Sequence, residues 1–270
     1  MKHLSTILAT CLCLLVSTAC QERDRYIAVT GYAQGGTYTV KMNLKGVRVA
    51  PDAIKSDIDS ILTLIDSTLS GYNKASILSR FNDGETVTPN DLFVDIYDYC
   101  EGIWRTTGGC VDVAGGPLFD IWGFGFKSGE MPDDAKVAQT LADCGMHRLL
   151  PRMEDAVRDG RLNPADLVKA GESGEFPRLN YNAVAQGYSC DMVADYLRGL
   201  GVKDMLVDIG EIYCSGLNPS GKPWTIGVDR PVDGNDKPGE DLDGIWNSEG
   251  RSTGIVTSGN YRKFYIRDGR

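Results

Sequence analysis

The segment from Asp112 to Gly125 restricts the possible folds of this chain more than any other part of its sequence. Its fourteen residues include four glycines, one proline and three aromatic residues. Glycine and proline interrupt helices and strands, so this composition predicts a loop with large apolar side chains and no regular element. Such a loop either covers a hydrophobic core or lines a ligand pocket, and both interpretations stay open at this point.

Regular elements are predicted on both sides of this loop. Before it, β-branched and alternating residues at 26–29 and 35–42 predict two strands joined by a glycine loop. Apolar residues at helical spacing predict four helices. They run between Pro51 and Gly71, over 92–104, over 135–142 and over 187–200.

The C-terminal half adds further predicted strands. Short strands at 179–181 and 205–209 flank the helix at 187–200, and this strand, helix, strand order predicts that part of the sheet is parallel. More strands are expected at 224–228, 254–257 and 261–266, while the polar stretch 152–176 is expected to be a surface excursion. The fold class is therefore α+β, with mixed sheets and helices packed on them.

Composition excludes several classes of protein. The chain has 270 residues, of which 42% are hydrophobic, so it can bury one large core or two small ones. Its formal net charge is -9, which makes nucleic acid a poor partner. Only two histidines occur, so a zinc site built from several histidines is impossible.

The N-terminus predicts export. Residues 1–19 combine a basic start with a short apolar stretch, as in a secretory signal peptide. Small residues followed by Cys20 resemble a bacterial lipoprotein processing site, which implies a lipid anchor on Cys20 and a mature domain at 20–270. The expected location is a bacterial membrane, on its periplasmic side or at the cell surface. A soluble secreted form is the alternative.

The cysteines of the mature chain give no metal or redox motif. No two of them are spaced as C-x-x-C, and without Cys20 their number is odd. We expect mostly buried, inert thiols, with a structural disulfide as the alternative. The five are Cys100, Cys110, Cys144, Cys190 and Cys214.

One phosphate-binding pattern fails. Residues 216–222 match the start of a P-loop, but Pro223 stands where a hydroxyl residue would hold magnesium. Proline also lacks the N–H that would bind phosphate, so a hairpin turn is expected here.

Five segments follow one another along the chain: Gly36-Thr37-Tyr38, Leu69 to Tyr72 with Ser76 and Ser79 to Asn82, Asp112 to Gly125, Asn182 to Tyr188, and Thr257 to Arg262. Two further pieces, Val207-Asp208-Ile209-Gly210 and Pro223-Trp224, stand between the last two segments. In sequence and in order, these segments resemble the ApbE-type FAD:protein FMN transferases, a flavin-transfer family.

This resemblance implies a T-fold-like architecture, FAD as substrate and Mg²⁺ as metal. It implies that a Thr or Ser hydroxyl of an acceptor flavoprotein receives FMN while AMP leaves. It also implies a metal ligand at Ala183, through the main-chain carbonyl because the side chain has no donor atom. The implied flavin contacts are Gly35, Tyr72, Cys110, Val111, Asp112, Asn180 and Gln186.

Structural roles remain open for these residues. Tyr72 could end a helix in the core, Asp112 could form a turn and Gln186 could start a helix. Two other functions also stay open: an FAD-binding lipoprotein without transfer activity, and a surface solute-binding or adhesion lipoprotein.

The end of the sequence predicts a truncated domain. Residues 261–267 read as a strand that runs into Asp268-Gly269, a strong hairpin signal, with no returning strand. Members of the family that this chain resembles continue past this strand with a His-containing segment and with residues that complete the magnesium site. We therefore expect weak FAD binding and poor FMN transfer.

Overall fold

The computed structural model describes residues 24–124, 131–172, 174–232, 234–235, 237 and 239–258. The signal segment, Cys20 and the predicted strand at 261–266 lie outside these residues. Within them, no helix is both long and apolar enough to cross a membrane.

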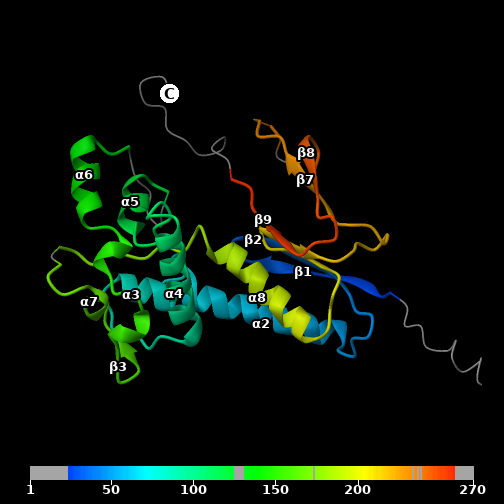
Figure 1. The fold of residues 1–270 in the computed structure, drawn as a ribbon, viewed down its shortest axis with the longest axis horizontal. Coiled ribbons are helices and arrows are strands. Elements are labelled where there is room, and N and C mark those ends of the chain that lie inside the picture. The colour runs from blue at the N-terminus through cyan, green and yellow to red at the C-terminus, as the bar shows by residue number, and fades with distance from the viewer. Residues whose placement is uncertain are drawn as a thin grey trace, which may run out of the picture.

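A five-stranded sheet forms one half of the molecule (Figure 1). Its order is β1-β2-β5-β6-β9, and every neighbouring pair is antiparallel. The strands are β1 (Tyr26–Ala33), β2 (Gly36–Asn43), β5 (Met205–Asp208), β6 (Ile212–Ser215) and β9 (Thr253–Ile255).

The prediction of a partly parallel sheet is wrong. Residues 179–181 are buried, and two of the three are apolar, a pattern that is also typical of a short strand. In the structure they form an irregular segment. The main chain of Leu179 bonds to the Asn82 side chain instead of to a neighbouring strand. The chain therefore enters helix α8 from outside the sheet.

Two helices cover one face of the sheet (Figure 1). Helix α2 (Pro51–Leu69) starts with proline, which suits the first helical turn, and buries an apolar stripe that includes Ile54, Ile58 and Leu62. Helix α8 (Ala185–Gly199) contacts α2, β5 and β6. Both helices agree with the sequence prediction.

Short helices make up the other half of the molecule. Asn90 caps helix α4 by accepting a hydrogen bond from the Phe93 N–H at 2.9 Å. The elements are α3 (Ile77–Asn82), α4 (Asp91–Thr106), α5 (Gly116–Ile121), α6 (Asp134–Ala142), α7 (Pro164–Leu167), the 3-10 turns Met146–Arg148 and Met153–Ala156, and the small hairpin β3 (Val157–Arg158) with β4 (Arg161–Leu162).

Two further sequence predictions fail in this half. The glycine-rich loop contains α5, because Pro117 favours a helix start and residues 118–122 hold no helix breaker. The stretch 152–176 is not a surface excursion, since Met153, Leu162 and Leu167 within it are fully buried.

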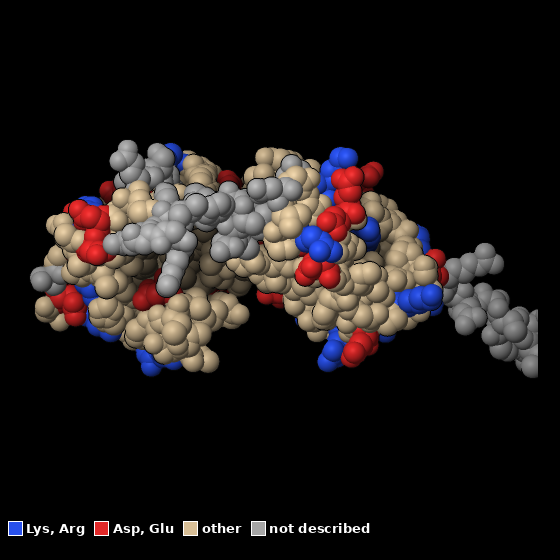
Figure 2. All heavy atoms as spheres, turned by 90° about the horizontal axis from the view of Figure 1, so that it is seen from above, with Lys and Arg blue, Asp and Glu red and all other residues tan. Residues whose placement is uncertain are grey.

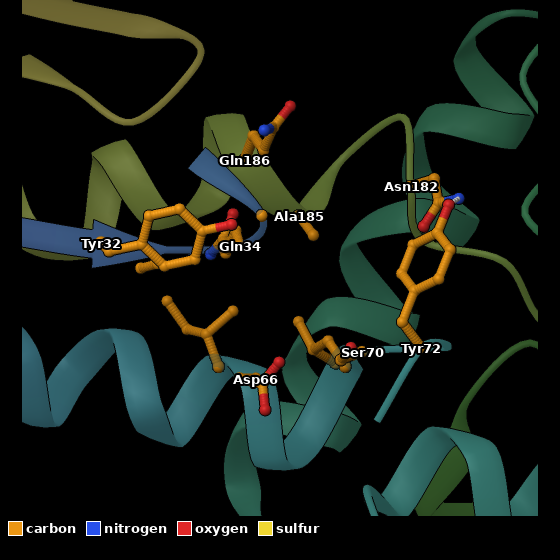
Figure 3. Close-up of a pocket in the computed structure, with 12 residues that line it drawn as sticks. Tyr32, Gln34, Asp66, Ser70, Tyr72, Asn182, Ala185 and Gln186 are labelled. Carbon is orange, nitrogen blue, oxygen red and sulfur yellow. Dashed lines mark hydrogen bonds between the residues drawn. The ribbon is translucent and has the colours of Figure 1, made fainter. Parts of the chain in front are cut away.

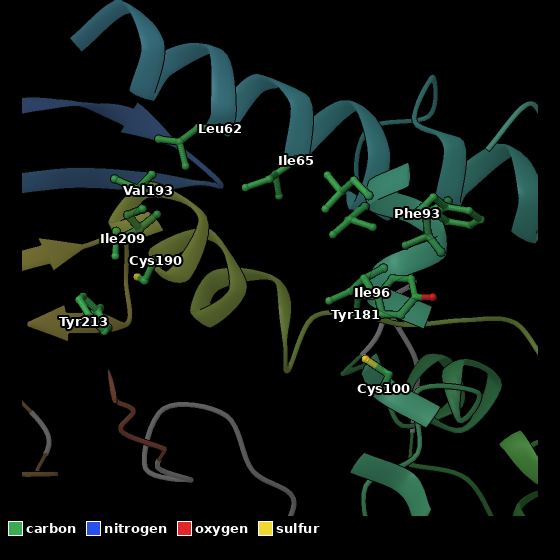
Figure 4. Packing of buried hydrophobic residues seen from close by; sticks show 14 of the residues in the cluster. Leu62, Ile65, Phe93, Ile96, Cys100, Tyr181, Cys190, Val193, Ile209 and Tyr213 are labelled. Atoms are coloured by element: carbon green, nitrogen blue, oxygen red, sulfur yellow. The ribbon is translucent and has the colours of Figure 1, made fainter. Parts of the chain in front are cut away.

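One hydrophobic cluster runs through both halves (Figure 4). Leu62 and Ile65 of α2 lie between Val193 of α8 and Phe93 and Ile96 of α4. Helix α2 contacts β1 and α8 on one side and α3 and α4 on the other, so the two halves share its buried face.

A second, smaller cluster lies under a separate hairpin. Strands β7 (Thr225–Asp229) and β8 (Leu242–Asn247) form a two-stranded sheet over Leu206, Cys214 and Trp224. Trp224 donates its indole N–H to the Ser215 carbonyl at 2.9 Å. This bond gives the Pro223-Trp224 segment a structural role.

The P-loop-like residues 216–222 form a turn, as expected. Leu217 pairs with Pro223, and the Asn218 N–H donates to the Lys222 carbonyl at 2.7 Å.

The thiols also follow the prediction in the main. None of the five described cysteines forms a disulfide; Cys100, Cys144, Cys190 and Cys214 are buried, whereas Cys110 is exposed. Burial raises the pKa of Cys100 and of Cys190 to about 12, so both thiols stay protonated at neutral pH.

Charged side chains of both signs are interspersed on the face shown in Figure 2. The described part of this face has no continuous basic area.

Candidate functional site

A cavity of about 710 Å³ opens where the two halves meet. Three parts of the chain line it: the turn between β1 and β2, the C-terminal end of α2 with the turn after it, and the start of α8 (Figure 3). The lining residues are Tyr32, Ala33, Gln34, Gly35, Ile65, Asp66, Leu69, Ser70, Tyr72, Asn182, Ala185 and Gln186.

The first wall is a two-residue turn. Ala33 pairs with Gly36, so Gln34 and Gly35 are the central residues, with φ of 52° and 81°. Two positive φ values define a type I′ turn, which matches the twist of the flanking strands. Glycine suits the second position, and the turn places the Gly35 main chain at the cavity.

Gln34 ties this turn to α8. Its Nε2 donates to the Ser189 hydroxyl at 2.5 Å, and that hydroxyl donates to the Ala185 carbonyl at 2.6 Å. The Gln34 Oε1 atom is buried and has no hydrogen-bond partner among the described residues. The two walls of the cavity are therefore joined by one side chain.

The second wall carries Tyr72 on a fixed turn. The Ser70 carbonyl accepts hydrogen bonds from the Ser76 hydroxyl at 2.6 Å and from the Ser79 hydroxyl at 3.1 Å. The Ser70 hydroxyl in turn accepts from the Asn73 N–H at 3.1 Å. These bonds explain the serines of this segment and hold Tyr72, whose side chain is 68% exposed, at the edge of the cavity.

Two tyrosines lie at opposite ends of the lining residues (Figure 3). Tyr32 is 74% exposed, and Tyr72 accepts a hydrogen bond from the Asn182 side chain at 3.3 Å. Exposed rings beside a cavity are suited to stacking on planar aromatic ligands. The alternative structural role of Tyr72, as a core residue at the end of a helix, is therefore excluded.

The third wall is the N-terminus of α8. No side chain caps this helix, and its first turn holds no acidic residue. The amides of the first turn carry partial positive charge, which favours an anion such as phosphate. Ala185 and Gln186 belong to this turn and line the cavity.

Gly210 gives Gln186 its space. A Cβ at Gly210 would come within 2.7 Å of Gln186 Nε2, and the φ of Gly210 is +86°. Only glycine fits both constraints. Asp208 and Glu211 flank this position, and burial raises the pKa of both carboxyl groups.

The other expected flavin contacts do not line this cavity. The Asp112 carboxylate accepts from the Ala114 N–H at 2.9 Å and from the Met146 N–H at 3.1 Å, so it shapes a turn. The exposed residues Cys110 and Val111 precede it. Asn180 is buried; its N–H donates to the Val113 carbonyl at 2.7 Å and thus joins the two segments.

Ala183 is exposed in the turn before α8, so its carbonyl is one possible oxygen ligand. No group of three His, Cys, Asp or Glu side chains that could hold a metal occurs in the described part of the chain. Mg²⁺ needs near-octahedral oxygen coordination, so these residues do not by themselves make a magnesium site.

Sequence reasoning missed several lining residues. Asp66 lies on α2 beside the buried stripe residues Ile65 and Leu69, and no sequence motif marks it. Its carboxylate accepts from the Asn73 side chain at 2.7 Å. Tyr32 and Gln34 precede the glycine pair, so a search for exposed aromatic and amide groups beside that turn could have found them.

Fold and site together define an α+β protein with a cavity suited to a ligand that has both aromatic and phosphate groups. A family model described as the ApbE family matches residues 34–270, and the chain belongs to this family. The resemblance seen in the sequence and the α+β fold class are thereby confirmed.

Curated relatives and solved structures agree with this assignment. The FAD:protein FMN transferase of Haemophilus influenzae is 29% identical over all of this chain and 75% of its own length. That of Vibrio cholerae is 28% identical over 95% of this chain and 72% of its own length.

Among solved structures, the flavin transferase ApbE from Vibrio cholerae has a TM-score of 0.71 and 26% identity, covering 91% of this chain and 75% of that one. The Pseudomonas stutzeri flavinyl transferase ApbE has a TM-score of 0.72 and 28% identity, covering 93% and 73%.

Proposed function

We propose that this protein is an FAD:protein FMN transferase that attaches FMN to a Thr or Ser hydroxyl of an acceptor flavoprotein. The observation that carries the proposal is the cavity between Tyr72, the Gly35 turn and the start of α8, in a chain that belongs to the ApbE family. Relatives that align with most of this chain bear that enzyme name.

The cavity fits FAD in volume and chemistry. Its 710 Å³ lies within the usual range of about 300–1,000 Å³ for small-molecule sites. The Tyr32 and Tyr72 rings would flank aromatic rings, and the α8 amides near Gln186 would face the pyrophosphate. No lining residue is Lys or Arg, so backbone amides would supply most of the positive potential that the protein contributes.

The transfer is a substitution at phosphorus. The acceptor hydroxyl releases its proton to solvent, its oxygen forms a bond to the FMN phosphorus, and the bond from that phosphorus to the bridging oxygen breaks. AMP leaves with the bridging oxygen. Positioning and charge stabilisation carry most of the rate in such reactions, so the fixed turns at Gly35 and Ser70 would orient FAD.

We further propose that transfer depends on Mg²⁺, with the Ala183 carbonyl as one ligand. A metal on the pyrophosphate supplies charge neutralisation there. The described residues hold no group of three His, Cys, Asp or Glu side chains that could complete such a site.

Location remains part of the proposal. The sequence of residues 1–20 supports export and a lipid anchor at Cys20, which would keep the enzyme at a bacterial membrane beside its acceptor.

Mass spectrometry tests the activity. The purified protein is incubated with FAD, Mg²⁺ and a flavin-free acceptor domain, and the acceptor is weighed while AMP is measured. A mass increase equal to FMN with stoichiometric AMP supports the proposal. FAD binding without AMP identifies a non-catalytic binder, and absence of FAD affinity favours a solute-binding lipoprotein. Efficient transfer would contradict our expectation of weak activity.

A further inference from the structure

Strand β1 forms an open edge of the five-stranded sheet. It pairs with β2 on one side, and no strand of the described chain pairs with its other side. The opposite edge is β9, which has three residues, whereas β1 has eight. The longer edge therefore offers more main chain for pairing.

The register shows which residues of β1 face outward. In a two-residue hairpin, the residues next to the turn form a hydrogen-bonded pair, here Ala33 and Gly36, and such pairs alternate along the strands. Ala28, Thr30 and Tyr32 are then the outward-facing residues. In agreement, the Asn43 N–H on β2 points away from β1 and donates to the Asp204 carbonyl at 2.9 Å.

This edge lacks the usual protection against pairing. Natural edge strands carry charged residues, prolines or bulges that prevent the addition of another strand. The β1 sequence from Tyr26 to Ala33 has no charged residue and no proline, and its pairing with β2 is continuous. Ala28 and Thr30 are small and exposed, so they leave room for a neighbouring strand.

A hollow beside this edge leads to the cavity. It encloses about 470 Å³ between β1 and α2, and Lys55, Asp59 and Thr63 line its far wall. Tyr32, Ala33 and Gln34 line both the hollow and the cavity. A chain lying along β1 would thus reach the cavity directly.

Gly31, which also lines this hollow, leaves room for the Tyr38 ring. A Cβ at Gly31 would lie 2.4 Å from the Tyr38 ring, which crosses β1 and donates its hydroxyl to Asp59. Asp59 also pairs with Lys55 at 2.6 Å. The wall opposite β1 is therefore tied to the sheet through Asp59 and Tyr38.

We infer that the free edge of β1 receives an extended segment of the acceptor protein, which adds as a strand and delivers its Thr or Ser hydroxyl to the cavity. This inference rests on the proposed function. Main-chain hydrogen bonds to Ala28, Thr30 and Tyr32 supply the affinity, as in other cases of strand addition. At about 3.3 Å per residue, a few residues beyond the paired part span the distance from Tyr32 into the cavity.

Hydrogen exchange tests the docking separately from the chemistry. Amide exchange of β1 is measured in the full protein, alone and with the flavin-free acceptor domain. The acceptor is expected to slow exchange at Ala28, Thr30 and Tyr32. If the β1 amides are protected without acceptor, and more strongly at higher protein concentration, the occupant of the edge is a second copy of this chain. That result would overturn the inference.

A proline substitution in β1 tests the same inference by mutation. Thr30→Pro removes an outward N–H without removing a bond to β2, and proline is tolerated at edge positions of this kind. It is expected to raise KM for the acceptor about tenfold, the equivalent of one good hydrogen bond, and to leave FAD affinity unchanged. Asp243→Pro, at the bulge of β8, is the control.

A second probe covers the case in which Thr30→Pro does not fold. Synthetic peptides that span the acceptor's flavinylation site are methylated on alternate main-chain nitrogens. Only one of the two alternating sets of methylated peptides should fail to slow amide exchange in β1. Equal effects of both sets, or no protection by the wild-type acceptor, overturn the inference. Failure of the proposed function is seen separately, as absence of FMN on the acceptor whether or not β1 is protected.

Discussion

Individual glycines determine where parts of this molecule can approach each other. At Gly116, a Cβ would lie 2.5 Å from the Arg178 carbonyl, which instead accepts the Gly116 N–H at 3.1 Å. At Gly210, the space is taken by the Gln186 amide. The first contact seats α5 against residue 178, and the second sets one wall of the cavity.

Gly210→Ala is expected to disturb the cavity. The positive φ costs about 1–3 kcal/mol for a residue with a side chain, and the Gln186 amide must also move. Gly221→Ala is a matched control, because Gly221 has a φ of +71° and open space around it. Thermal unfolding should show a loss in both variants, whereas FAD titration should show weaker binding only in Gly210→Ala. Equal FAD affinity in both would contradict the role of Gln186.

Tyr72 is expected to act through its ring. Tyr72→Ala should weaken FAD binding about tenfold, because an aromatic contact contributes about 0.5–1.5 kcal/mol beyond its burial. Tyr72→Phe should bind almost as well, since it keeps the ring, and the change removes only the hydroxyl that accepts from Asn182 at 3.3 Å. Flavin fluorescence titration measures both, with Tyr99→Ala as a control at an exposed tyrosine outside the cavity. Unchanged affinity in Tyr72→Ala would show that FAD binds elsewhere.

At the scale of elements, side-chain clamps hold the irregular segments. The Asn82 side chain, at the end of α3, makes two 2.8 Å hydrogen bonds to the main chain of Leu179, one donated and one accepted. The Asp112 carboxylate holds a turn in a similar way, by accepting the main-chain N–H groups of Ala114 and Met146. These bonds replace strand pairing for buried main chain that would otherwise lack partners.

Asn82→Ala is expected to loosen the segment before α8. The loss of both bonds leaves buried main-chain groups of Leu179 unpaired, which costs about 1–3 kcal/mol per group. Denaturant unfolding should show the loss, and the Leu179 amide should exchange faster. Arg80→Ala on the same helix breaks only an exposed pair with Glu85 and should change stability by less than about 1 kcal/mol. Similar losses in the two variants would contradict the clamp.

Local periodicity predicted the long elements correctly because their own residues determine them. The stripe of α2 and the glycine after it mark that helix without reference to the rest of the chain. Strand partners and the path of residues 179–181 depend on contacts with Asn82, nearly a hundred positions away, which no local pattern contains. The short helix α5 was predicted to be a loop because of its glycines, and Gly116 among them allows the close contact with Arg178.

The cavity was predictable only in part. Gly35, Tyr72 and Gln186 belong to family segments and line it. Asp66 and Tyr32 carry no motif, so their place depends on how α2 and β1 pack. The roles of Cys110, Val111, Asp112, Asn180 and Ala183 toward FAD and metal stay predictions.

At the scale of the whole molecule, partly buried carboxyl groups make stability depend on pH. Burial raises the pKa of Asp208 above its ordinary 3.8, although Lys41 and the Gly210 N–H oppose the shift. The folded state therefore binds this proton more tightly than the unfolded state does. Its contribution to stability is present below about pH 3.8 and is lost as pH rises through the raised pKa.

Asp208→Asn should therefore stabilise the protein at neutral pH and flatten this part of the pH profile. The amide oxygen can still accept from Gly210, so the turn is kept. Urea unfolding from pH 4 to pH 8 measures the difference between variant and wild type, which should grow with pH. A variant that is less stable than wild type at pH 7 would show that the attraction of Lys41 outweighs burial.

Helix α2 has a consequence for how the molecule loses its structure. Its apolar face completes the core under the sheet and also the core among the short helices, so neither half has a full set of buried contacts without it. We therefore expect the two halves to unfold together, as one cooperative unit. Because the cavity is built from both halves, it exists only while that entire unit is intact.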